Sequence, residues 1–195
     1  PQPQAYIFDP ELPYWIIYRN QLFDSVCRKL DFDVFEVFRD RQLTNKLLSS
    51  SGELRVLKSR NLSDDGKEIL DIPGYDSYIS YAAAKPLSVF QYLDASNVYL
   101  TPNMTYKPRM MKKPPHCVVN GSLAILIPKG GIVPTEKQLA YFSSEEYRAF
   151  YQIARNFQTR SLNVDACSVF FYGLLRDEAK PAPEKFDTSV QLSFL

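Results

Sequence analysis

The residues best suited to chemistry are cations that gather in a stretch without acids. Between Asp94 and Glu136 there is no acidic residue, although the whole chain has 22 acids against 23 Lys and Arg and a net charge of only +1. This interval holds five basic residues, which are Lys107, Arg109, Lys112, Lys113 and Lys129. A local positive patch attracts phosphate groups even on a nearly neutral protein. The stretch therefore indicates a contact with nucleic acid, and a solvated surface loop is the alternative.

Within this stretch, residues 106–116 have a composition that is costly for a merely solvated loop. They combine four cations with Tyr106, two methionines and three prolines. Exposed Met and Tyr lower solubility, and proline stiffens the backbone. The composition therefore favours a surface that is covered by a phosphate-bearing partner.

Side chains for nucleophilic or metal catalysis are sparse. His116 is the only histidine, and it follows two prolines in a basic segment, which is typical of a loop histidine rather than of a catalytic pair. A site with two histidine ligands is impossible within this chain. The thiols of Cys27, Cys117 and Cys167 form no CxxC pair, which disfavours a zinc site or a disulfide scaffold and suits a reducing cytoplasm.

Motifs for cofactor binding and for nuclease chemistry are also missing. The chain contains no GxG, GxGxxG or Walker pattern that could cradle the phosphates of a cofactor. A metal-dependent nuclease needs an aspartate followed by Glu-x-Lys, and the segment Glu53-Leu54-Arg55 lacks the lysine. We therefore expect the chain by itself to catalyse nothing.

The elements that must position the cations are of both kinds, helices and strands. With 45% hydrophobic and 14% aromatic residues, the 195-residue chain can bury a sizeable core. Apolar spacing and capping residues predict helices at 14–30, 86–93 and 144–157, with one or two helical turns at 42–48. Strands are predicted at 32–38, 54–57, 75–81, 98–101, 117–119 and 123–127, and residues 169–175 are predicted to be a last strand or a buried segment.

Both ends of the chain differ in composition from its middle. Residues 1–13 begin with Pro-Gln-Pro-Gln rather than Met and are predicted to be a linker from an upstream domain. Residues 14–176 are predicted to form one domain, and residues 177–195 a C-terminal tail. The longest uncharged run, between Lys113 and Lys129, contains prolines and a glycine, so we expect no membrane span. The start is not a basic and then apolar segment, so we expect no signal peptide.

Three segments carry a resemblance to a known family. The first is FRDRQL at 38–43, followed by RVLKSRNL at 55–62; the second is YLTPNMTYKPR at 99–109, followed by VNGSLAIL at 119–126. The third is YFSSEEYRAFY at 141–151, followed by ARNFQTRSL at 154–162. Together they resemble the C-terminal, TaqI-like target-recognition domain of adenine-specific DNA methyltransferases from type II restriction–modification systems, with the type IIS group as the nearest. The likeness covers about residues 14–175.

This resemblance implies a fold, a cofactor and partners. The fold is mixed α+β, a single recognition domain with a curved, mostly antiparallel sheet and peripheral helices. S-adenosylmethionine is expected in the absent catalytic domain, with no cofactor or metal in this chain. The expected partners are double-stranded DNA and an upstream methyltransferase domain of the same polypeptide. A methyltransferase of this kind flips an adenine out of the duplex, and its recognition domain selects which adenine.

The resemblance also implies roles for individual side chains. Arginine can bridge guanine and asparagine can bridge adenine, whereas lysine binds phosphate as a point charge. The base-edge candidates are Arg39, Arg41, Arg60, Asn61, Asn103 and Arg109. The phosphate candidates are Lys58, Lys107, Lys112 and Lys113, with Tyr106 beside them.

Purely structural roles remain open for several of these residues. Arg39 and Arg41 could instead pair with Asp33, Glu36 or Asp40. The pair Arg60-Asn61 could simply build a turn, as could Asn120-Gly121. Two other functions also remain open. One is a specificity-subunit-like DNA-binding module of a type I system, which needs a long helical spacer, and the other is a small metal-dependent nuclease.

Overall fold

The computed structural model describes residues 3–158 and 163–176. Its α-helices are α1 (Gln4–Ile7), α2 (Gln21–Lys29), α3 (Tyr81–Ala84), α4 (Glu136–Tyr141) and α5 (Glu145–Ala154). Its 3-10 helices are η1 (Asn45–Leu47), η2 (Ser59–Asn61), η3 (Ser88–Tyr92), η4 (Lys129–Gly131) and η5 (Ser168–Phe171). Its strands are β1 (Leu30–Asp31), β2 (Phe35–Phe38), β3 (Leu54–Leu57), β4 (Ser77–Ile79), β5 (Tyr99–Pro102), β6 (Met111–Lys112), β7 (Cys117–Val119), β8 (Leu123–Pro128) and β9 (Leu174–Leu175). In this part of the chain, no helix has the length and apolar character that crossing a bilayer requires.

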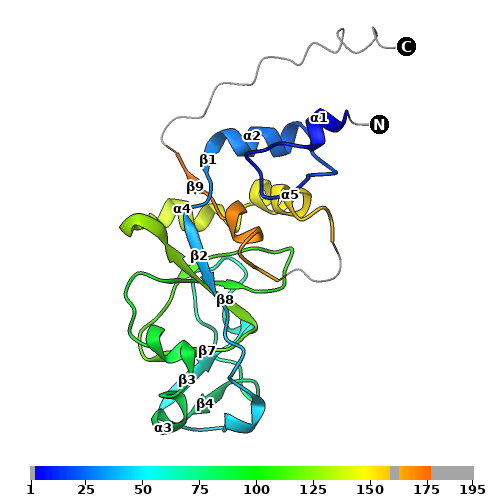
Figure 1. The fold of residues 1–195 in the computed structure, drawn as a ribbon. Helices are drawn as coiled ribbons and strands as arrows, with labels where there is room; N and C mark the ends of the chain where they lie inside the picture. Colours follow the sequence, from blue (N-terminus) through cyan, green and yellow to red (C-terminus); the bar gives the residue numbers. More distant parts are fainter. Residues whose placement is uncertain (1–2, 159–162, 177–195) are drawn as a thin grey trace, which may run out of the picture.

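The expected α+β class, with mostly antiparallel pairing, is confirmed. The strands form three sheets rather than one: a central antiparallel sheet in the order β2-β8-β5-β6, a sheet in the order β4-β3-β7, and the pair β1-β9. Among the strands of residues 3–158 and 163–176, only the β3–β7 pairing is parallel. Figure 1 shows α1, α2 and α5 at one end of the molecule, the β4-β3-β7 sheet at the other end, and β2 and β8 between them.

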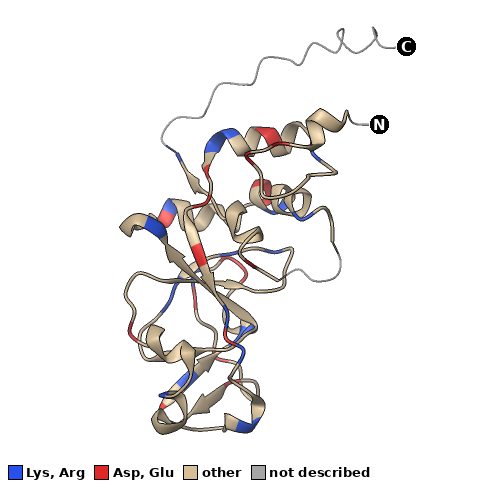
Figure 2. Cartoon of the chain, viewed as in Figure 1, with Lys and Arg blue, Asp and Glu red and all other residues tan. Residues whose placement is uncertain are grey.

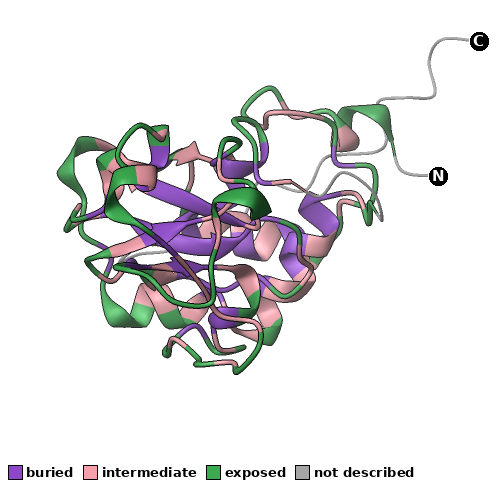
Figure 3. Ribbon diagram, turned by 90° about the horizontal axis from the view of Figure 1, so that it is seen from below, coloured by how far each residue is buried: buried purple, intermediate pink, exposed green. Residues whose placement is uncertain are grey.

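The central sheet separates two hydrophobic cores. Because successive side chains of a strand point to opposite faces, Tyr99 and Leu126 enter the core beside α2 and α5, whereas Leu100 and Ile125 enter the core that includes β3, β4 and β7. The first core is rich in aromatic rings, and the rings of Phe23 and Phe150 are stacked at 5.1 Å. Seen from below in Figure 3, the strands are buried and the surrounding loops are exposed.

The N-terminal part of the chain departs from the predicted helix at 14–30. Helix α2 begins at Gln21 because the Asn20 side chain accepts a hydrogen bond from the Phe23 N–H and caps the helix there. The segment predicted to be a linker packs on this helix. The Tyr6 hydroxyl donates to Asp24 at 2.6 Å, and Arg19 binds both Asp24 at 2.8 Å and Asp9 at 2.9 Å. The predicted tail, 177–195, lies outside the described residues.

Other predicted elements are shorter than expected or begin elsewhere. The helix predicted at 144–157 is α5, which has Ser144 as its N-cap and ends at Ala154. The helix predicted at 86–93 is the 3-10 helix η3, and the segment 169–175 is divided between η5 and the short strand β9. The strands predicted at 54–57 and 117–119 are confirmed with the same bounds.

An exposed apolar patch lies where the N-terminal segment meets the end of α5. Phe8 and Trp15 are in edge-to-face contact at 6.0 Å, and so are Tyr18 and Phe157 at 5.2 Å. All four rings and the side chain of Ile17 are exposed. The backbone of Phe157 has φ 50°, a left-handed conformation that is uncommon for a bulky residue.

Candidate nucleic-acid interface

Four loops meet at one end of the central sheet, and we call residues 39–43, 58–62, 103–109 and 120–122 the loop cluster. Strand pairing brings them together. Phe38 pairs with Ile125 and Pro102 pairs with Leu123, so the loops after β2 and β5 lie beside the start of β8. Leu57 pairs with Val119 in the parallel pair β3–β7, so the loop after β3 lies beside the turn that connects β7 to β8.

This turn, 120–122, is the centre of the loop cluster. The Asn120 N–H donates to the Leu57 carbonyl at 3.1 Å, and the Ser122 hydroxyl accepts from the Ser59 N–H at 2.9 Å. The carbonyl of Gly121 accepts from the Asn103 amide at 3.1 Å. A Cβ atom on Gly121 would stand 2.6 Å from the Asp40 carbonyl oxygen. Asn120-Gly121 thus lies in a turn, the structural role that the sequence left open for the pair, and each of the other three loops touches it.

Asn103 holds the cluster together instead of presenting an amide to a base. Its side chain is buried, with 6% of the residue exposed. The amide donates to Gly121 and, at 2.9 Å, to the Asn163 side chain, and its oxygen accepts from the Val164 N–H at 3.0 Å and from Arg39 at 3.4 Å. With these partners the side chain has no free edge, so the expected contact with adenine is replaced by a structural role.

Arg109 and Asn61 are also committed to the protein. Arg109 is 8% exposed and donates to the carbonyls of Lys107, Ser59 and Leu62 at 3.1–3.2 Å, which ties the loop after β5 to the loop after β3. Burial lowers the pKa of its guanidinium below the ordinary value. The buried Asn61 donates to Asp76 at 2.6 Å and caps η2. Neither side chain is available to base edges.

Tyr75 carries two cations of the loop after β3 on its ring. The Lys58 ammonium lies 3.9 Å and the Arg60 guanidinium 4.7 Å from the ring centroid. Lys58 also donates to the Ser77 hydroxyl at 3.0 Å and to the Tyr75 carbonyl, and burial lowers the pKa of its ammonium. Arg60 is exposed, so the ring holds a guanidinium at the surface.

The remaining cations of the cluster differ in exposure. Arg39 is half-buried beside Asn103, and Arg41 and Lys107 are exposed. Within the described residues, the side chains of Arg41 and Lys107 make no hydrogen bond or ion pair. The aspartates that could have formed ion pairs with Arg39 and Arg41 have other partners. Asp33 binds Lys129 at 2.6 Å, and Asp40 accepts hydrogen bonds from two backbone N–H groups of its own loop.

Lys112 and Lys113 do not belong to the cluster. They lie on and after β6, where Lys112 pairs with Tyr99 at the opposite end of β5. Lys113 is 3% exposed, and its ammonium donates to the carbonyls of Leu93 at 2.8 Å and Pro114 at 2.9 Å. Burial lowers the pKa of Lys113. The sequence-based role of Lys113 as a phosphate clamp is therefore replaced by a structural one, because sequence does not show which of two neighbouring lysines points inward.

Tyr106 lies on the cluster but faces the protein. It is half-buried, its hydroxyl is shielded from solvent, and burial raises its pKa.

Two residues of the cluster region were not identified from the sequence. Asp76 receives hydrogen bonds from Asn61 and Arg55, which no local motif announces. Met104 is 62% exposed between the buried Asn103 and the cations, and its PNMTYKP setting could have identified it.

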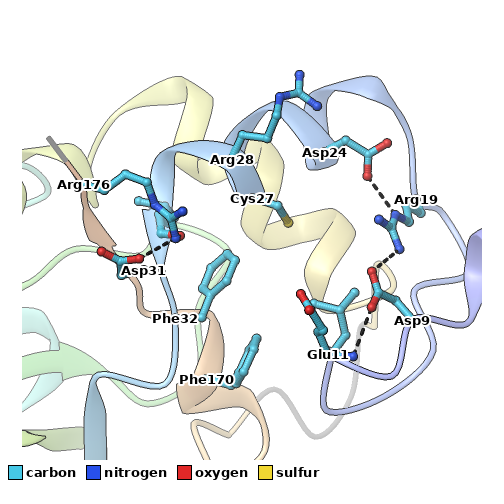
Figure 4. A pocket seen from close by; sticks show the side chains of 12 residues that line it. Asp9, Glu11, Arg19, Asp24, Cys27, Arg28, Asp31, Phe32, Phe170 and Arg176 are labelled. Carbon is cyan, nitrogen blue, oxygen red and sulfur yellow. Dashed lines mark hydrogen bonds and ion pairs between the residues drawn. The ribbon is translucent and has the colours of Figure 1, made fainter. Parts of the chain in front are cut away.

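A pocket of about 490 Å³ lies at the other end of the molecule, beside α2 (Figure 4). Its charges largely neutralise each other, since Arg19 binds Asp9 and Asp24 and Arg176 binds Asp31. Burial raises the pKa of the Cys27 thiol to about 12, which keeps it protonated and unreactive. Among the described residues there is no group of three or more His, Cys, Asp or Glu that could hold a metal ion.

Comparison with known proteins gives no family: the sequence matches no protein-family model, and no curated protein matches it. The loop cluster is thus the candidate site on its geometry alone. Lys and Arg occur over the whole molecule, interspersed with Asp and Glu (Figure 2), so what distinguishes the cluster is that its four joined loops carry the exposed cations Arg41, Arg60 and Lys107. Such a surface can bind phosphates through ammonium groups and planar base edges through guanidinium groups.

Proposed function

We propose that this chain is the DNA target-recognition domain of an adenine-specific DNA methyltransferase of a type II restriction–modification system. Its catalytic domain, with S-adenosylmethionine, lies outside the chain, and its partners are duplex DNA and that upstream domain, in the cytoplasm. The observation that carries the proposal is the convergence of Arg39, Arg41, Arg60 and Lys107, which follow three different strands, on one loop cluster. Recognition of a duplex needs cations of this kind fixed by a rigid frame.

The resemblance and the geometry point to the same residues. The first two segments that resemble target-recognition domains, 38–43 with 55–62 and 99–109 with 119–126, contain all four loops of the cluster. These segments are far apart in the sequence, yet hydrogen bonds join them in space. This coincidence supports a shared role for the segments.

The proposal divides the candidate residues by task. Asn61, Asn103 and Arg109 fix the loops, because their polar atoms are bound within the protein. Base edges are left to Arg39, Arg41 and Arg60, whose guanidinium groups suit guanine O6 and N7. Lys107 is the proposed phosphate ligand, and Lys58 contributes to the site through its cation–π contact with the Tyr75 ring. Helix α5, with 10 residues, is the longest described helix, which does not favour the long spacer of a type I specificity module.

A salt titration of duplex binding tests the proposal. The protein and a variant with Arg41→Ala, Arg60→Ala and Lys107→Ala are titrated onto a pool of random 30-base-pair duplexes, and log affinity is plotted against log salt. On random duplexes, where Arg41 and Arg60 meet no cognate base and contact phosphates as Lys107 does, the slope should become shallower by about 2–3 units in the variant, since each phosphate contact contributes about 0.9. All three residues are exposed, so the variant should fold normally.

A matched variant controls for net charge. Lys85→Ala, Lys112→Ala and Lys137→Ala remove the same three charges from exposed positions outside the cluster. This variant should keep the slope of the unmodified protein. Equal effects of the two triple variants, or no binding to any duplex at low salt, would contradict the proposal.

A further inference from the structure

Met104 is the exposed apolar side chain of the loop cluster. It is 62% exposed, whereas Pro102 and Asn103 before it and Pro108 after it are buried. An exposed methionine has unfavourable contact with water, and its flexible, polarizable thioether packs well against apolar groups of varied shape. Its exposure near the start of the loop after β5 leaves it available to a partner surface.

The backbone that carries Met104 is firmly held. The preceding Asn103 makes hydrogen bonds to Gly121, Asn163, Val164 and Arg39. On the following side, the Thr105 hydroxyl accepts from the Lys107 N–H at 2.8 Å and closes a tight turn. A side chain on such a frame can be presented with little loss of backbone entropy on binding.

Cations lie in the same loop cluster as this apolar side chain. The Arg39 guanidinium donates at 3.4 Å to the side-chain oxygen of Asn103, the residue before Met104, and the exposed Lys107 follows Met104 by three residues in the same loop. An apolar side chain that shares a surface with cations bound to DNA can reach the base edges of the groove. The only apolar group that a base pair presents in the major groove is the C5-methyl group of thymine.

We propose that Met104 reads a thymine in the target sequence by packing against its C5-methyl group. This inference rests on the proposed function, and it specifies one base of the target sequence and the residue that contacts it. The alternative, insertion of Met104 between base pairs, requires unstacking of a base step, and the contact with a methyl group requires no distortion of the duplex. Met104 is thus a specificity-determining residue in the same loop cluster as the arginines.

Uracil substitution tests this contact, because uracil pairs as thymine does and lacks only the methyl group. The protein first selects a target from a random duplex pool, and each thymine of the selected duplex is then replaced singly by uracil. At one position, the replacement should weaken binding by the unmodified protein roughly three- to fivefold. The same replacement should leave the affinity of Met104→Ala unchanged, since that variant has already lost the contact.

Two further variants separate apolar contact from other effects. Met104→Leu keeps an apolar side chain and should retain sensitivity to uracil at that position, and Met104→Gln, of similar length, should lose it. All three variants alter an exposed side chain, and unchanged thermal midpoints would show that they fold.

The outcomes distinguish the inference from the function on which it rests. If a target is selected but uracil has no effect at any position, or has equal effects on the protein and on Met104→Ala, the thymine contact is refuted and DNA recognition stands. If 2-aminopurine in the target brightens with the protein but not with Met104→Ala, and uracil has no effect, Met104 is a wedge and the inference fails. If no sequence is enriched, the proposed recognition function fails as well.

Discussion

The position of a Cβ atom on Gly121 lies 2.6 Å from the carbonyl oxygen of Asp40. This separation is far below normal contact, so no side chain fits between the turn 120–122 and the loop after β2. Gly121 lets these two backbones approach closely, and its carbonyl receives the Asn103 amide at the same point. The spacing of the loop cluster therefore depends on the absence of one methyl group.

Gly121→Ala should lower the free energy of unfolding by about 1–3 kcal/mol, because the added methyl group pushes the backbone of Asp40 away. It should also weaken duplex binding, since Arg39 and Arg41 flank Asp40. Thermal denaturation and binding to the selected duplex measure the two effects.

Gly74→Asn is the control for adding a side chain at a glycine. Gly74 has φ 76°, which asparagine tolerates, and no atom lies within 4 Å of its Cβ position. It should change stability and binding little. A Gly121→Ala protein with the stability and affinity of the original would contradict the close approach.

Lys113→Ala should destabilise the protein without changing the salt dependence of DNA binding. The substitution removes the donor to the carbonyls of Leu93 and Pro114 and the packing of a buried stem, for an expected cost of about 2–4 kcal/mol. Chemical denaturation measures the cost.

The neighbouring Lys112→Ala is the matched comparison, because Lys112 is exposed. It should change stability by less than about 0.5 kcal/mol. A shallower salt slope for Lys113→Ala, with stability retained, would restore Lys113 as a phosphate ligand.

Asp76→Asn should lower stability at neutral pH, with a difference that fades in acid. Burial raises the pKa of Asp76, but hydrogen bonds from the Ile72 N–H, Asn61 and Arg55 outweigh it and hold the pKa below the usual value of 3.8. Since the unfolded chain then takes up the proton first as pH falls, the stabilisation is fully present above about pH 4 and is lost as pH falls through the folded pKa. Loss of these charged hydrogen bonds should cost about 1–2 kcal/mol at pH 7.

Asp71→Asn separates this effect from a general loss of charge around Arg55. Asp71 lies 2.6 Å from Arg55, but its side chain is 85% exposed. Its replacement should have little effect on unfolding at either pH. A pH-independent loss in Asp76→Asn would show that the carboxylate charge is not what stabilises the loop.

Replacement of Tyr75 should affect duplex binding according to whether a ring remains. Tyr75→Phe keeps the face on which Lys58 and Arg60 lie, so binding should be unchanged. Tyr75→Leu should weaken binding about two- to fivefold, the equivalent of one exposed cation–π contact. Equal affinities for the two variants would mean that the ring does not position Arg60.

Strands were predicted better than helices because their signal is local. The segments 54–57 and 117–119 are short β-branched or apolar runs whose bounds follow from the residues themselves. The helix predicted at 14–30 was wrong in its first turns. Pro13 suggested a helix start at Tyr14, but the Asn20 side chain caps the helix and it begins at Gln21. The division of the strands into three sheets depends on long-range pairings such as Phe38 with Ile125, which no local pattern contains.

The types of the candidate residues follow from the sequence, but their orientation does not. Arg39, Arg41, Arg60 and Lys107 lie in three loops of the cluster, with Arg39 half-buried and the other three exposed. Asn61, Asn103, Arg109 and Lys113 point inward, because each satisfies carbonyls or amides of neighbouring loops that only the folded chain brings near. Composition identifies the cations, and tertiary contacts decide which remain free for a partner.

Strands β5 and β8 place side chains in both hydrophobic cores. Neither core can be opened without exposing one face of this strand pair, so the two halves of the molecule should lose structure in a single concerted transition. The backbone amides of β5 and β8 should then be the last to exchange with deuterated solvent. The loops adjoining these strands are fixed at Asn103 and Ser122 by a backbone hydrogen bond between the two residues. We therefore expect proteolytic cleavage within the loop cluster to require global unfolding of the chain.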